Sequence, residues 1–397
     1  MEPINLFAPE FVADPYPFYA DMRAHSPVCP VEPGGALAIS RYTDVMSVLK
    51  SPDRFSSAEF VAAFEPEWLG YNPGLHTMLS MDPPAHTKNR NLISRTWLPA
   101  AIARAEPNIR ALIERLVARV EHQDEVEFVS EFATPLTAGA LGQFLALDPA
   151  LYPQFKTWSD MLTSITPVPP SAEYAQAVRT TVKEMEAYFG SVIDERMKSP
   201  GEDVISSLTQ AQLDGESLTK DQLIAFMFLL VVAGIETTIH LLSKSLLTLT
   251  QQPDILQQVR SDAALIPRFI EEMLRYDPPI HNLYRQATRD VEIAGSLIPA
   301  GTSVMVMLAA ANRDPDQFPS PNTFDLNRSN QAHVAFGHGP HFCLGAALAR
   351  LEARLALELL LSRFSSFTIV DNDIPWYHTL TVRGPAQLPI RFSNAKG

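Results

Sequence analysis

Cys343 is the residue of this sequence best suited to chemistry, because it lies in a glycine-rich turn directly before a helix. The turn reads Phe-Gly-His-Gly-Pro-His-Phe-Cys-Leu-Gly from Phe336 to Gly345, and the apolar stretch that follows predicts a helix. Gly337, Gly339 and Gly345 permit torsions and close approaches that a Cβ would obstruct, so the chain can lie flat against a large planar ligand. A sulfur ahead of a helix receives backbone N–H donors and the positive end of the helix dipole, which favour thiolate over thiol. The pattern therefore predicts a thiolate ligand for iron.

Two other interpretations of this turn stay open. Cys343 could be an inert, buried side chain in a turn that merely precedes a helix, since free cysteine is often part of a core. A zinc site could use His338, His341 and Cys343, but these ligands would be crowded into six residues with no second pair to complete a tetrahedron. The iron ligand is the favoured interpretation.

A second candidate site lies in a long apolar segment that an acid and a hydroxyl interrupt. This segment reads Ala-Gly-Ile-Glu-Thr-Thr from Ala233, so that Glu236 and Thr237 are its polar centre. Polar groups are costly to bury unless they are used. Gly234 has no side chain, so a small molecule could lie against the helix, and the Thr237 hydroxyl could bend the local hydrogen-bond ladder or donate to bound oxygen. The alternative is a helix that bonds these groups only to its own carbonyls.

Together these motifs resemble the cytochrome P450 family. In that family the cysteine of the turn is the axial ligand of haem iron, and the acid and threonine lie at the site of oxygen activation. The resemblance implies that Cys343 ligates the iron of haem b, iron protoporphyrin IX, and that Glu236 and Thr237 deliver protons. With the other motifs, which come in the family's order, the likeness extends from about residue 5 to residue 392.

The resemblance also assigns roles to charged residues in other segments. Glu272 and Arg275 stand three apart on one predicted helix face and match the family's structural Glu-x-x-Arg element. Arginine offers a fork that suits a carboxylate, and haem carries two propionates that need cations. The residues at the family's propionate-binding positions are His86, Arg90, Arg285 and His341.

The elements that must position these residues are mainly helices. Thr219 and Gln222 form a capping box that opens a helix running to about Gln252, before Pro253. No linker, charge run or repeat divides the chain, so we expect one domain over residues 1–397. The resemblance implies a triangular fold, mainly α with small β-sheets on one side and a buried haem between two helices. Short β-branched or alternating runs predict strands at 36–41, 291–295, 302–308, 367–370 and 388–392.

Composition narrows the class of protein. The chain is 46% hydrophobic and 19% charged, which suits a deep core, and its net charge of −14 argues against nucleic acid and anionic membrane surfaces. Its two cysteines, Cys29 and Cys343, form no disulfide framework, which fits a reducing cytoplasm. The longest uncharged apolar run, 223–235, has thirteen residues, too few for the roughly 20 that span a bilayer. We therefore expect a cytoplasmic monomer without a membrane anchor.

The implied reaction is the insertion of one oxygen atom of O2 into a C–H bond or a double bond, because thiolate donation to haem iron favours O–O cleavage. The chain has no Gly-x-Gly-x-x-Gly fingerprint after a strand and no length for a flavin domain, so electrons from NAD(P)H must arrive through partner proteins. A ferredoxin and a ferredoxin reductase are the family's usual bacterial source. Positive charge for docking the donor could come from Lys88, Arg95, Arg350 and Arg354.

Three other functions are alternatives to this reaction. A peroxide-driven haem-thiolate enzyme would lack the acid and threonine that this chain has. A non-catalytic haem-binding sensor or carrier would need no such pair. A haem-thiolate oxidase that couples or rearranges carbons in secondary metabolism is compatible with the motifs.

The expected substrate is a compact neutral hydrophobe, with terpenoid-like skeletons favoured over macrolide or steroid ones. Residues 55–87 contain no lysine or arginine, so this loop offers no permanent cation to a carboxylate, which would be costly to bury unpaired. By their positions in the family, the residues expected to line the pocket are mostly apolar: Phe60, Phe64, Trp68, Leu69, Leu79, Leu229, Leu230, Ala233, Ile280, Leu283 and Leu380.

Overall fold

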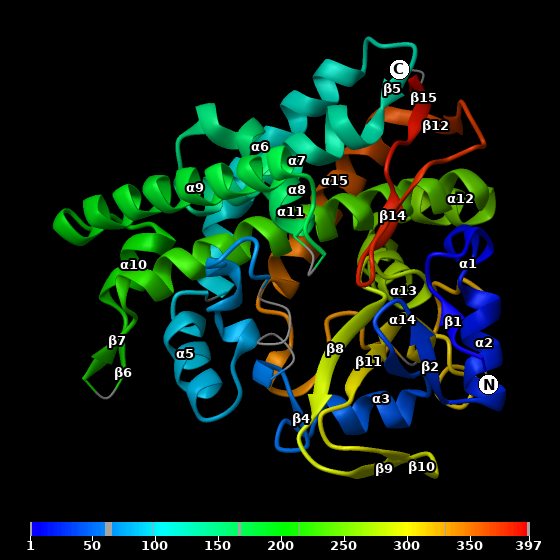
Figure 1. The fold of residues 1–397 in the computed structure, drawn as a ribbon. Helices are drawn as coiled ribbons and strands as arrows, with labels where there is room; N and C mark the ends of the chain where they lie inside the picture. The colour runs from blue at the N-terminus through cyan, green and yellow to red at the C-terminus, as the bar shows by residue number, and fades with distance from the viewer. Residues whose placement is uncertain are drawn as a thin grey trace. The chain divides into compact units, whose positions relative to one another are not determined.

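Helices predominate over short strands in the computed structural model (Figure 1). It describes residues 2–59, 66–97, 99–165, 168–213, 215–329 and 331–394. The chain forms two compact units, each described here by itself. The sheet unit comprises Met1–Ser56, Ile113–Ala133 and Thr237–Gly397, and the helical unit comprises Ser57–Leu112 and Thr134–Glu236. Two helices, α6 (Pro99–Val120) and α11 (Lys220–Gln251), run from one unit into the other.

The sheet unit is built on a six-stranded sheet in the order β1-β2-β3-β11-β8-β4. The strands described in this unit are β1 (Ile4–Asn5), β2 (Val28–Glu32), β3 (Ala36–Ile39), β4 (Phe55–Ser56), β5 (Val126–Glu127), β8 (Asn282–Ala287), β9 (Val291–Ile293), β10 (Ser296–Ile298), β11 (Ser303–Met307), β12 (Phe364–Ile369), β13 (Trp376–His378), β14 (Arg383–Pro385) and β15 (Pro389–Asn394). Its α-helices are α1 (Pro9–Ala13), α2 (Tyr16–His25), α3 (Tyr42–Leu49), α12 (Pro253–Ser261), α13 (Ile266–Tyr276), α14 (Leu308–Ala311) and α15 (Ala346–Arg363).

Strand β11 shows how the large sheet packs on both faces. Val304 and Val306 point to one face and join a core cluster with side chains of α3. Met305 and Met307 point to the other face and join a second cluster with side chains of α2. Successive side chains of a strand alternate between faces, so a run of five apolar or small residues buries a core on each side.

The five strands predicted from the sequence are confirmed as β3, β9, β11, β12 and β15, with small shifts at their ends. Strand β8 was not predicted. It pairs antiparallel with β11, with Arg285 opposite Val304. Its sequence, Asn-Leu-Tyr-Arg-Gln-Ala, has no β-branched residue and no clear alternation, so tertiary pairing outweighs local propensity there.

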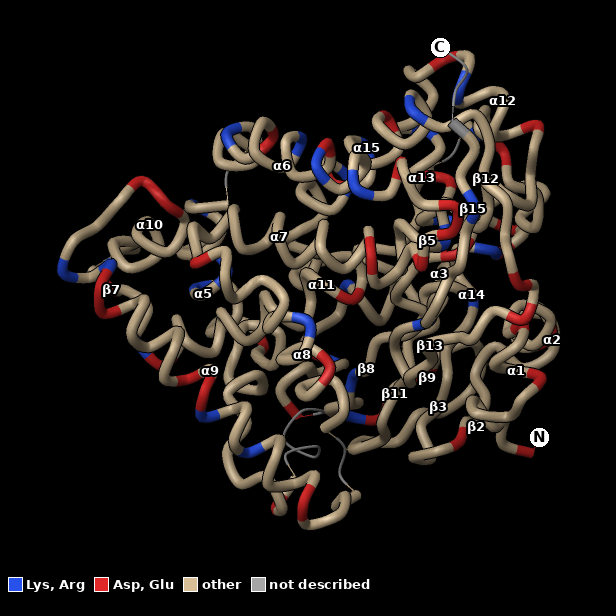
Figure 2. Tube along the Cα trace, turned by 90° about the horizontal axis from the view of Figure 1, so that it is seen from above, with Lys and Arg blue, Asp and Glu red and all other residues tan. Residues whose placement is uncertain are grey.

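The helical unit contains α5 (Ala85–Ser94), α7 (Thr134–Phe144), α8 (Tyr152–Thr163), α9 (Ala172–Lys198), α10 (Val204–Gln210) and a small hairpin of β6 (Gln212–Leu213) and β7 (Glu216–Ser217). Acidic and basic residues are both present along α6 and α9 (Figure 2), so neither helix carries charges of one sign alone. A face of mixed charge offers no basic stripe for a polyanion.

The start of α11 confirms the predicted capping box. The Thr219 N–H donates to Oε1 of Gln222 at 2.9 Å, and the Gln222 N–H donates to Oγ1 of Thr219 at 3.2 Å. These two bonds satisfy backbone donors that have no partner inside the helix. The helix ends at Gln251, next to Pro253, which begins α12.

A buried charge cluster joins α11 to the rest of the sheet unit. Nζ of Lys244 donates to Oδ1 of Asp277 at 2.7 Å and to the Pro278 carbonyl at 2.9 Å, and the Tyr16 hydroxyl donates to the same carboxylate at 2.7 Å. Burial lowers the pKa of Lys244 to about 8. Burial alone would raise the pKa of Asp277, but Lys244 and its other cationic neighbours hold it well below its usual value. Lys244 and Asp277 therefore form an ion pair at neutral pH.

We expect Asp277→Asn to destabilise the protein by about 3–5 kcal/mol, because it leaves a buried ammonium without its counter-charge. The double variant Lys244→Met/Asp277→Asn should regain most of that loss, because it removes the buried ammonium together with its counter-charge. Urea unfolding of the wild type, both single variants and the double variant measures the coupling. Equal losses for Asp277→Asn and for the double variant would show that the pair contributes through packing alone.

Candidate active site

The cysteine turn is fixed by backbone hydrogen bonds within the sheet unit. The Cys343 N–H donates to the Phe336 carbonyl at 2.9 Å, and the Gly337 N–H donates to the Val334 carbonyl at 2.8 Å. Helix α15 begins at Ala346, so Cys343 lies just ahead of its first turn, and its side chain is half-buried. A thiolate there is close to the positive end of the helix.

The three glycines of the turn do different things. Gly337 and Gly339 have φ of +69° and +72°, which L side chains rarely adopt. A Cβ on Gly339 would also lie 2.6 Å from the carbonyl oxygen of Leu49, so α3 approaches the turn too closely for any other residue. Gly345 has an ordinary φ of −80°, and a Cβ there would lie 3.9 Å from Sγ of Cys343. The backbone therefore requires glycine at the first two positions and not at the third.

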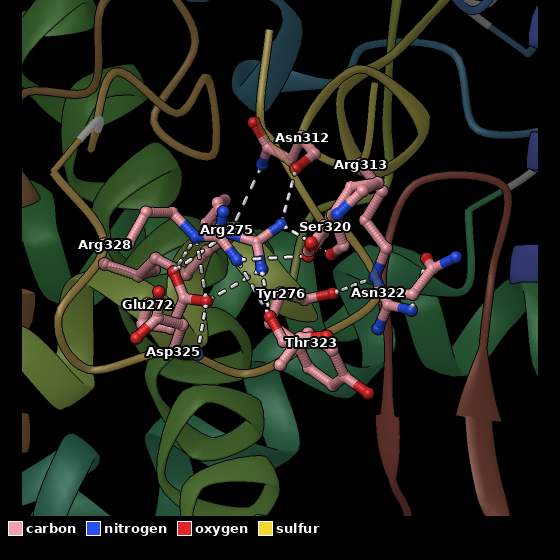
Figure 3. Close-up of polar contacts among 12 residues, drawn as sticks. Glu272, Arg275, Tyr276, Asn312, Arg313, Ser320, Asn322, Thr323, Asp325 and Arg328 are labelled. Carbon is pink, nitrogen blue, oxygen red and sulfur yellow. Dashed lines mark hydrogen bonds and ion pairs between the residues drawn. The ribbon is translucent and has the colours of Figure 1, made fainter. Parts of the chain in front are cut away.

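The Glu272 and Arg275 pair is buried and bidentate, as expected of a structural element (Figure 3). Nε and Nη2 of Arg275 both donate to the Glu272 carboxylate at 2.8 Å, and both side chains are 1% exposed. Arg275 also donates to the carbonyls of Asn312, Pro321 and Thr323. The pair thus fixes the backbone at these three residues, which precede the cysteine turn in the chain.

A third member of this network, Arg328, was not identified from the sequence. Its Nε donates to both oxygens of Glu272 at 3.2 Å, and its guanidinium reaches the carbonyls of Pro319, Ser320 and Thr323 (Figure 3). Arg328 is 7% exposed. One carboxylate therefore pairs with two buried guanidinium groups, and no spacing in the sequence indicates the contact with Arg328.

Glu236, the acid of the predicted proton-delivery pair, has a cationic partner that the sequence did not reveal. Nζ of Lys156, on α8, lies 2.9 Å from Oε1 of Glu236, and the same ammonium contacts Asp160 one turn further along α8. Glu236 is 3% exposed, whereas the side chain of Asp160 is 50% exposed. The three charges run from a buried helix face to the surface of the helical unit.

The pKa of Glu236 shifts in a direction that suits proton transfer. Burial raises the pKa of Glu236, and its ion pair with Lys156 opposes that rise without cancelling it. Burial would lower the pKa of Lys156, but Glu236 and Asp160 hold it above its usual value. Glu236 therefore takes up a proton more readily than an exposed glutamate does.

The small residues of this part of α11 are arranged differently from the expectation. A Cβ on Gly234 would lie 3.6 Å from Cδ2 of Leu141, so this glycine faces α7. The exposed small residue is its neighbour Ala233, although most of α11 is buried. Thr237 is half-buried and Thr238 is buried. Ala233, and not Gly234, is therefore the position where a ligand could lie against the helix.

The four residues expected to bind propionates lie in both units. In the sheet unit, Arg285 on β8 is 8% exposed and His341 is half-buried in the cysteine turn. A Cβ on Gly337 would lie 3.9 Å from Cδ1 of Leu283, so β8 runs beside that turn. In the helical unit, His86 is 2% exposed and Arg90 is half-buried one turn further along α5.

The residues expected to line the pocket differ in their exposure. Phe60 and Phe64 lie outside the described residues. Leu69 and Leu230 are buried, Trp68 and Leu229 are half-buried, and Leu79 is 50% exposed. Three partly buried side chains, Ile280, Leu283 and Leu380, pack against the two core clusters of the sheet unit.

The chemistry of these residues fits a haem, which is a flat apolar ring with two anionic propionates. Cys343 offers a soft sulfur ligand ahead of a helix, and Ala233 offers a small exposed surface on an otherwise buried helix. Arg285 is a buried cation that could pair with a carboxylate.

This chain is similar to known proteins over most of its length. Residues 148–387 match the family model described as Cytochrome P450. The cytochrome P450 monooxygenase PikC of Streptomyces venezuelae is 35% identical over 404 residues, which cover 98% of this chain and 93% of PikC. The structure of CYP109Q5 from Chondromyces apiculatus has a TM-score of 0.91 and 35% identity, with 99% of each chain covered. That of CYP109E1 from Bacillus megaterium in complex with corticosterone has a TM-score of 0.86 and 31% identity, covering 96% of this chain and 99% of the other.

The fold is that of the haem-thiolate oxidoreductases of the cytochrome P450 family, and the chain belongs to that family. It is a P450 monooxygenase of the bacterial type, mainly α with small β-sheets. By length and composition α11 could cross a membrane, but 67% of its most apolar window is buried inside the protein, as in a core helix.

One buried acid near this site was not identified from the sequence. Glu352 is 3% exposed on α15, and within the described residues its Oε2 has no hydrogen-bond partner. Burial raises the pKa of Glu352 well above its usual value. The native side chain therefore keeps its proton to a higher pH than an exposed glutamate does.

We expect Glu352→Gln to flatten the dependence of stability on pH. Unfolded glutamate ionises near pH 4.3, whereas the native group stays neutral, so the wild type loses about 1.4 kcal/mol for each pH unit between the unfolded and native pKa values. Below the unfolded pKa this loss is absent. Urea unfolding from pH 4 to pH 8 should show the advantage of the glutamine variant growing with pH, while Glu358→Gln on the same helix follows the wild type. Parallel curves for Glu352→Gln and wild type would contradict this.

Proposed function

We propose that Cys343 is the axial thiolate ligand of haem b in this monooxygenase. The observation that carries the proposal is the cysteine turn, in which two glycines with positive φ and the Phe336 carbonyl fix Cys343 ahead of α15. Propionate cations come from Arg285 and His341, and from His86 and Arg90 as the family resemblance assigns them. When bound, haem supplies O2 activation and the oxidant that inserts one oxygen atom into the substrate.

We propose that Glu236 and Thr237 deliver the protons this reaction needs. The route opens to solvent at Asp160, whose side chain is half exposed, and Lys156 links that carboxylate to Glu236. Thr237 follows Glu236 on α11 and passes the proton onward from its hydroxyl. The raised pKa of Glu236 supports this order, because the buried carboxyl takes up a proton more readily than an exposed glutamate does.

Electrons are proposed to come from NAD(P)H through a ferredoxin reductase and a ferredoxin. The enzyme works as a single-domain monomer in the cytoplasm, with α11 as a core helix. An assay with a surrogate ferredoxin and ferredoxin reductase, which measures NADH consumed against product formed, checks this supply.

The proposed substrate is a compact neutral hydrophobe, terpenoid-like first and steroid- or macrolide-like second. The corticosterone in the similar CYP109E1 structure supports a neutral polycyclic ligand. The loop 55–87 carries no lysine or arginine of its own.

One observation favours a second candidate, a substrate with a carboxylate. Arg179 of α9 donates from Nη1 to the Trp68 carbonyl at 2.8 Å and from Nη2 to Gln176 at 3.1 Å. Within the described residues it has no acidic partner. A permanent cation thus lies against the loop that lacks one, and it could pair with an acid.

A spectral titration of the purified ferric enzyme distinguishes these candidates. Terpenes, steroids, macrolides, fatty acids and aromatic acids are each added while the low-spin to high-spin shift is measured. Tight shifts with neutral polycyclic compounds support the first candidate. Tight shifts with acids alone, weakened in Arg179→Gln, support the second. Products that carry one atom from labelled O2 support insertion, whereas coupled or rearranged products without label support an oxidase.

A further inference from the structure

Arg350 of α15 is held by the carboxylate of Glu271 on α13. Its Nε and Nη2 donate to the Glu271 carboxylate at 2.6 and 2.8 Å, which is the bidentate geometry of a strong charge-assisted pair. Burial would raise the pKa of Glu271, but Arg350 and His333 lower it to about 2. The carboxylate is therefore charged and neutralises the guanidinium.

His333 completes this cluster and is 3% exposed at its side chain. The Ala335 N–H donates to Nδ1 of His333 at 3.2 Å, so that nitrogen carries no proton. The other ring nitrogen, Nε2, lies 3.1 Å from Oε2 of Glu271, so its N–H donates to that carboxylate. His333, Glu271 and Arg350 form one satisfied network.

The network reaches Cys343 through Phe336. The guanidinium of Arg350 lies over the Phe336 ring, 4.5 Å from its centroid, and the Phe336 carbonyl accepts the Cys343 N–H at 2.9 Å. A cation over an aromatic face is attracted to it. The same residue thus touches the arginine with its ring and the cysteine with its backbone.

Glu271 and Glu272, two neighbouring acids of α13, anchor the segment that leads to Cys343. This segment begins at about Asp325 and ends at about His333. Glu272 holds the start, because it accepts from the Asp325 N–H at 2.9 Å and from Arg328 (Figure 3). Glu271 holds the end through His333 and Arg350. The segment is therefore fixed on one rigid helix at both ends.

We propose that Arg350 is a positioning residue for Cys343, held by Glu271 and pressed against Phe336, and not a docking cation for the electron donor. The inference rests on the proposed role of Cys343 as haem ligand. A lysine at position 350 would keep the charge but lose both the fork and the planar stack. Arg350 contributes by fixing the position of Cys343, so its loss should lower the stability of the bond between the Cys343 thiolate and the haem iron.

The test compares haem-loaded Arg350→Gln, Arg350→Lys and Glu271→Gln with the wild type. In the reduced, carbon monoxide-bound state and in dilute urea, the red-shifted Soret band of thiolate ligation should convert to the unshifted band about tenfold faster or more in each variant, because a bidentate charged contact is lost. Arg354→Gln is the matched control, since Arg354 pairs at 2.8 Å with Glu358 on its own helix. It should convert at the wild-type rate.

A wild-type band lifetime in Arg350→Gln, with slower and less salt-dependent reduction by ferredoxin, would overturn the inference and restore Arg350 as a docking cation. If the wild type itself lacked the band, or Cys343→His kept it, the proposed haem ligand would fail instead. If Arg350→Gln does not fold with haem bound, the band lifetime is measured in Arg350→Lys and His333→Gln instead. Wild-type lifetimes in both would refute the positioning role.

Discussion

Cys343→His should abolish the red-shifted Soret band of the reduced, carbon monoxide-bound protein. Only a thiolate ligand gives that band, and imidazole at the same position would ligate iron as a neutral nitrogen. The turn around Cys343 should survive the change, because Gly337, Gly339 and the Phe336 carbonyl fix its backbone. Haem content by pyridine extraction and the Soret spectrum measure the two effects separately.

Cys29→Ser is the matched control for that experiment. Cys29 is 1% exposed on β2, opposite Ala38 of β3, and burial raises the pKa of its thiol to about 11. A thiol that stays protonated is a poor metal ligand. The band should therefore be unchanged in Cys29→Ser, and a band that persisted in Cys343→His would refute the assignment of Cys343.

The features that the sequence could predict are local ones. The cysteine turn, the capping box of α11 and the Glu272–Arg275 pair each depend on residues a few positions apart. The strand β11 was predictable because burial of both its faces leaves a continuous apolar run. In each case the physical cause acts over one turn of helix or one strand.

The features that could not be predicted depend on contacts between distant segments. Arg328 lies far along the chain from Glu272 and meets it only in the folded protein. Arg350 looked like a surface cation because the sequence shows its charge and not the carboxylate that neutralises it. Gly234 faces Leu141 and not a ligand, because one glycine cannot fix which side of a helix turns inward.

The partner of Glu236 is the most consequential of these contacts. Glu236 alone would be an isolated buried acid, which is costly. Lys156 turns it into one end of a chain of charges whose other end, Asp160, is open to solvent. That arrangement predicts effects on proton delivery and not on substrate binding.

Glu236→Gln should lower the rate of product formation by about 10²-fold or more, within the range that a positioned proton donor contributes. Thr237→Ala should consume NADH at a near-normal rate but release the electrons as hydrogen peroxide, because oxygen is reduced without reaching the substrate. The spectral dissociation constant for substrate should stay near the wild-type value in both. Unchanged coupling in Thr237→Ala would show that Thr237 only packs, or that Thr238 replaces it.

The dependence of turnover on pH tests whether Asp160, Lys156 and Glu236 act together in proton delivery. Lys156→Met removes the cation that lowers the pKa of Glu236, so Glu236 should hold its proton to higher pH, and the apparent pKa of turnover should move upward. Asp160→Asn removes a negative charge that raises the pKa of Glu236, so the same apparent pKa should move downward. Lys156→Arg keeps the charge and should leave the profile near that of the wild type.

Opposite shifts in two neighbouring α8 variants are hard to obtain from a general loss of structure, which would lower turnover at every pH. If both variants moved the profile in the same direction, or neither moved it, protons would reach Thr237 by a route that does not pass through Glu236.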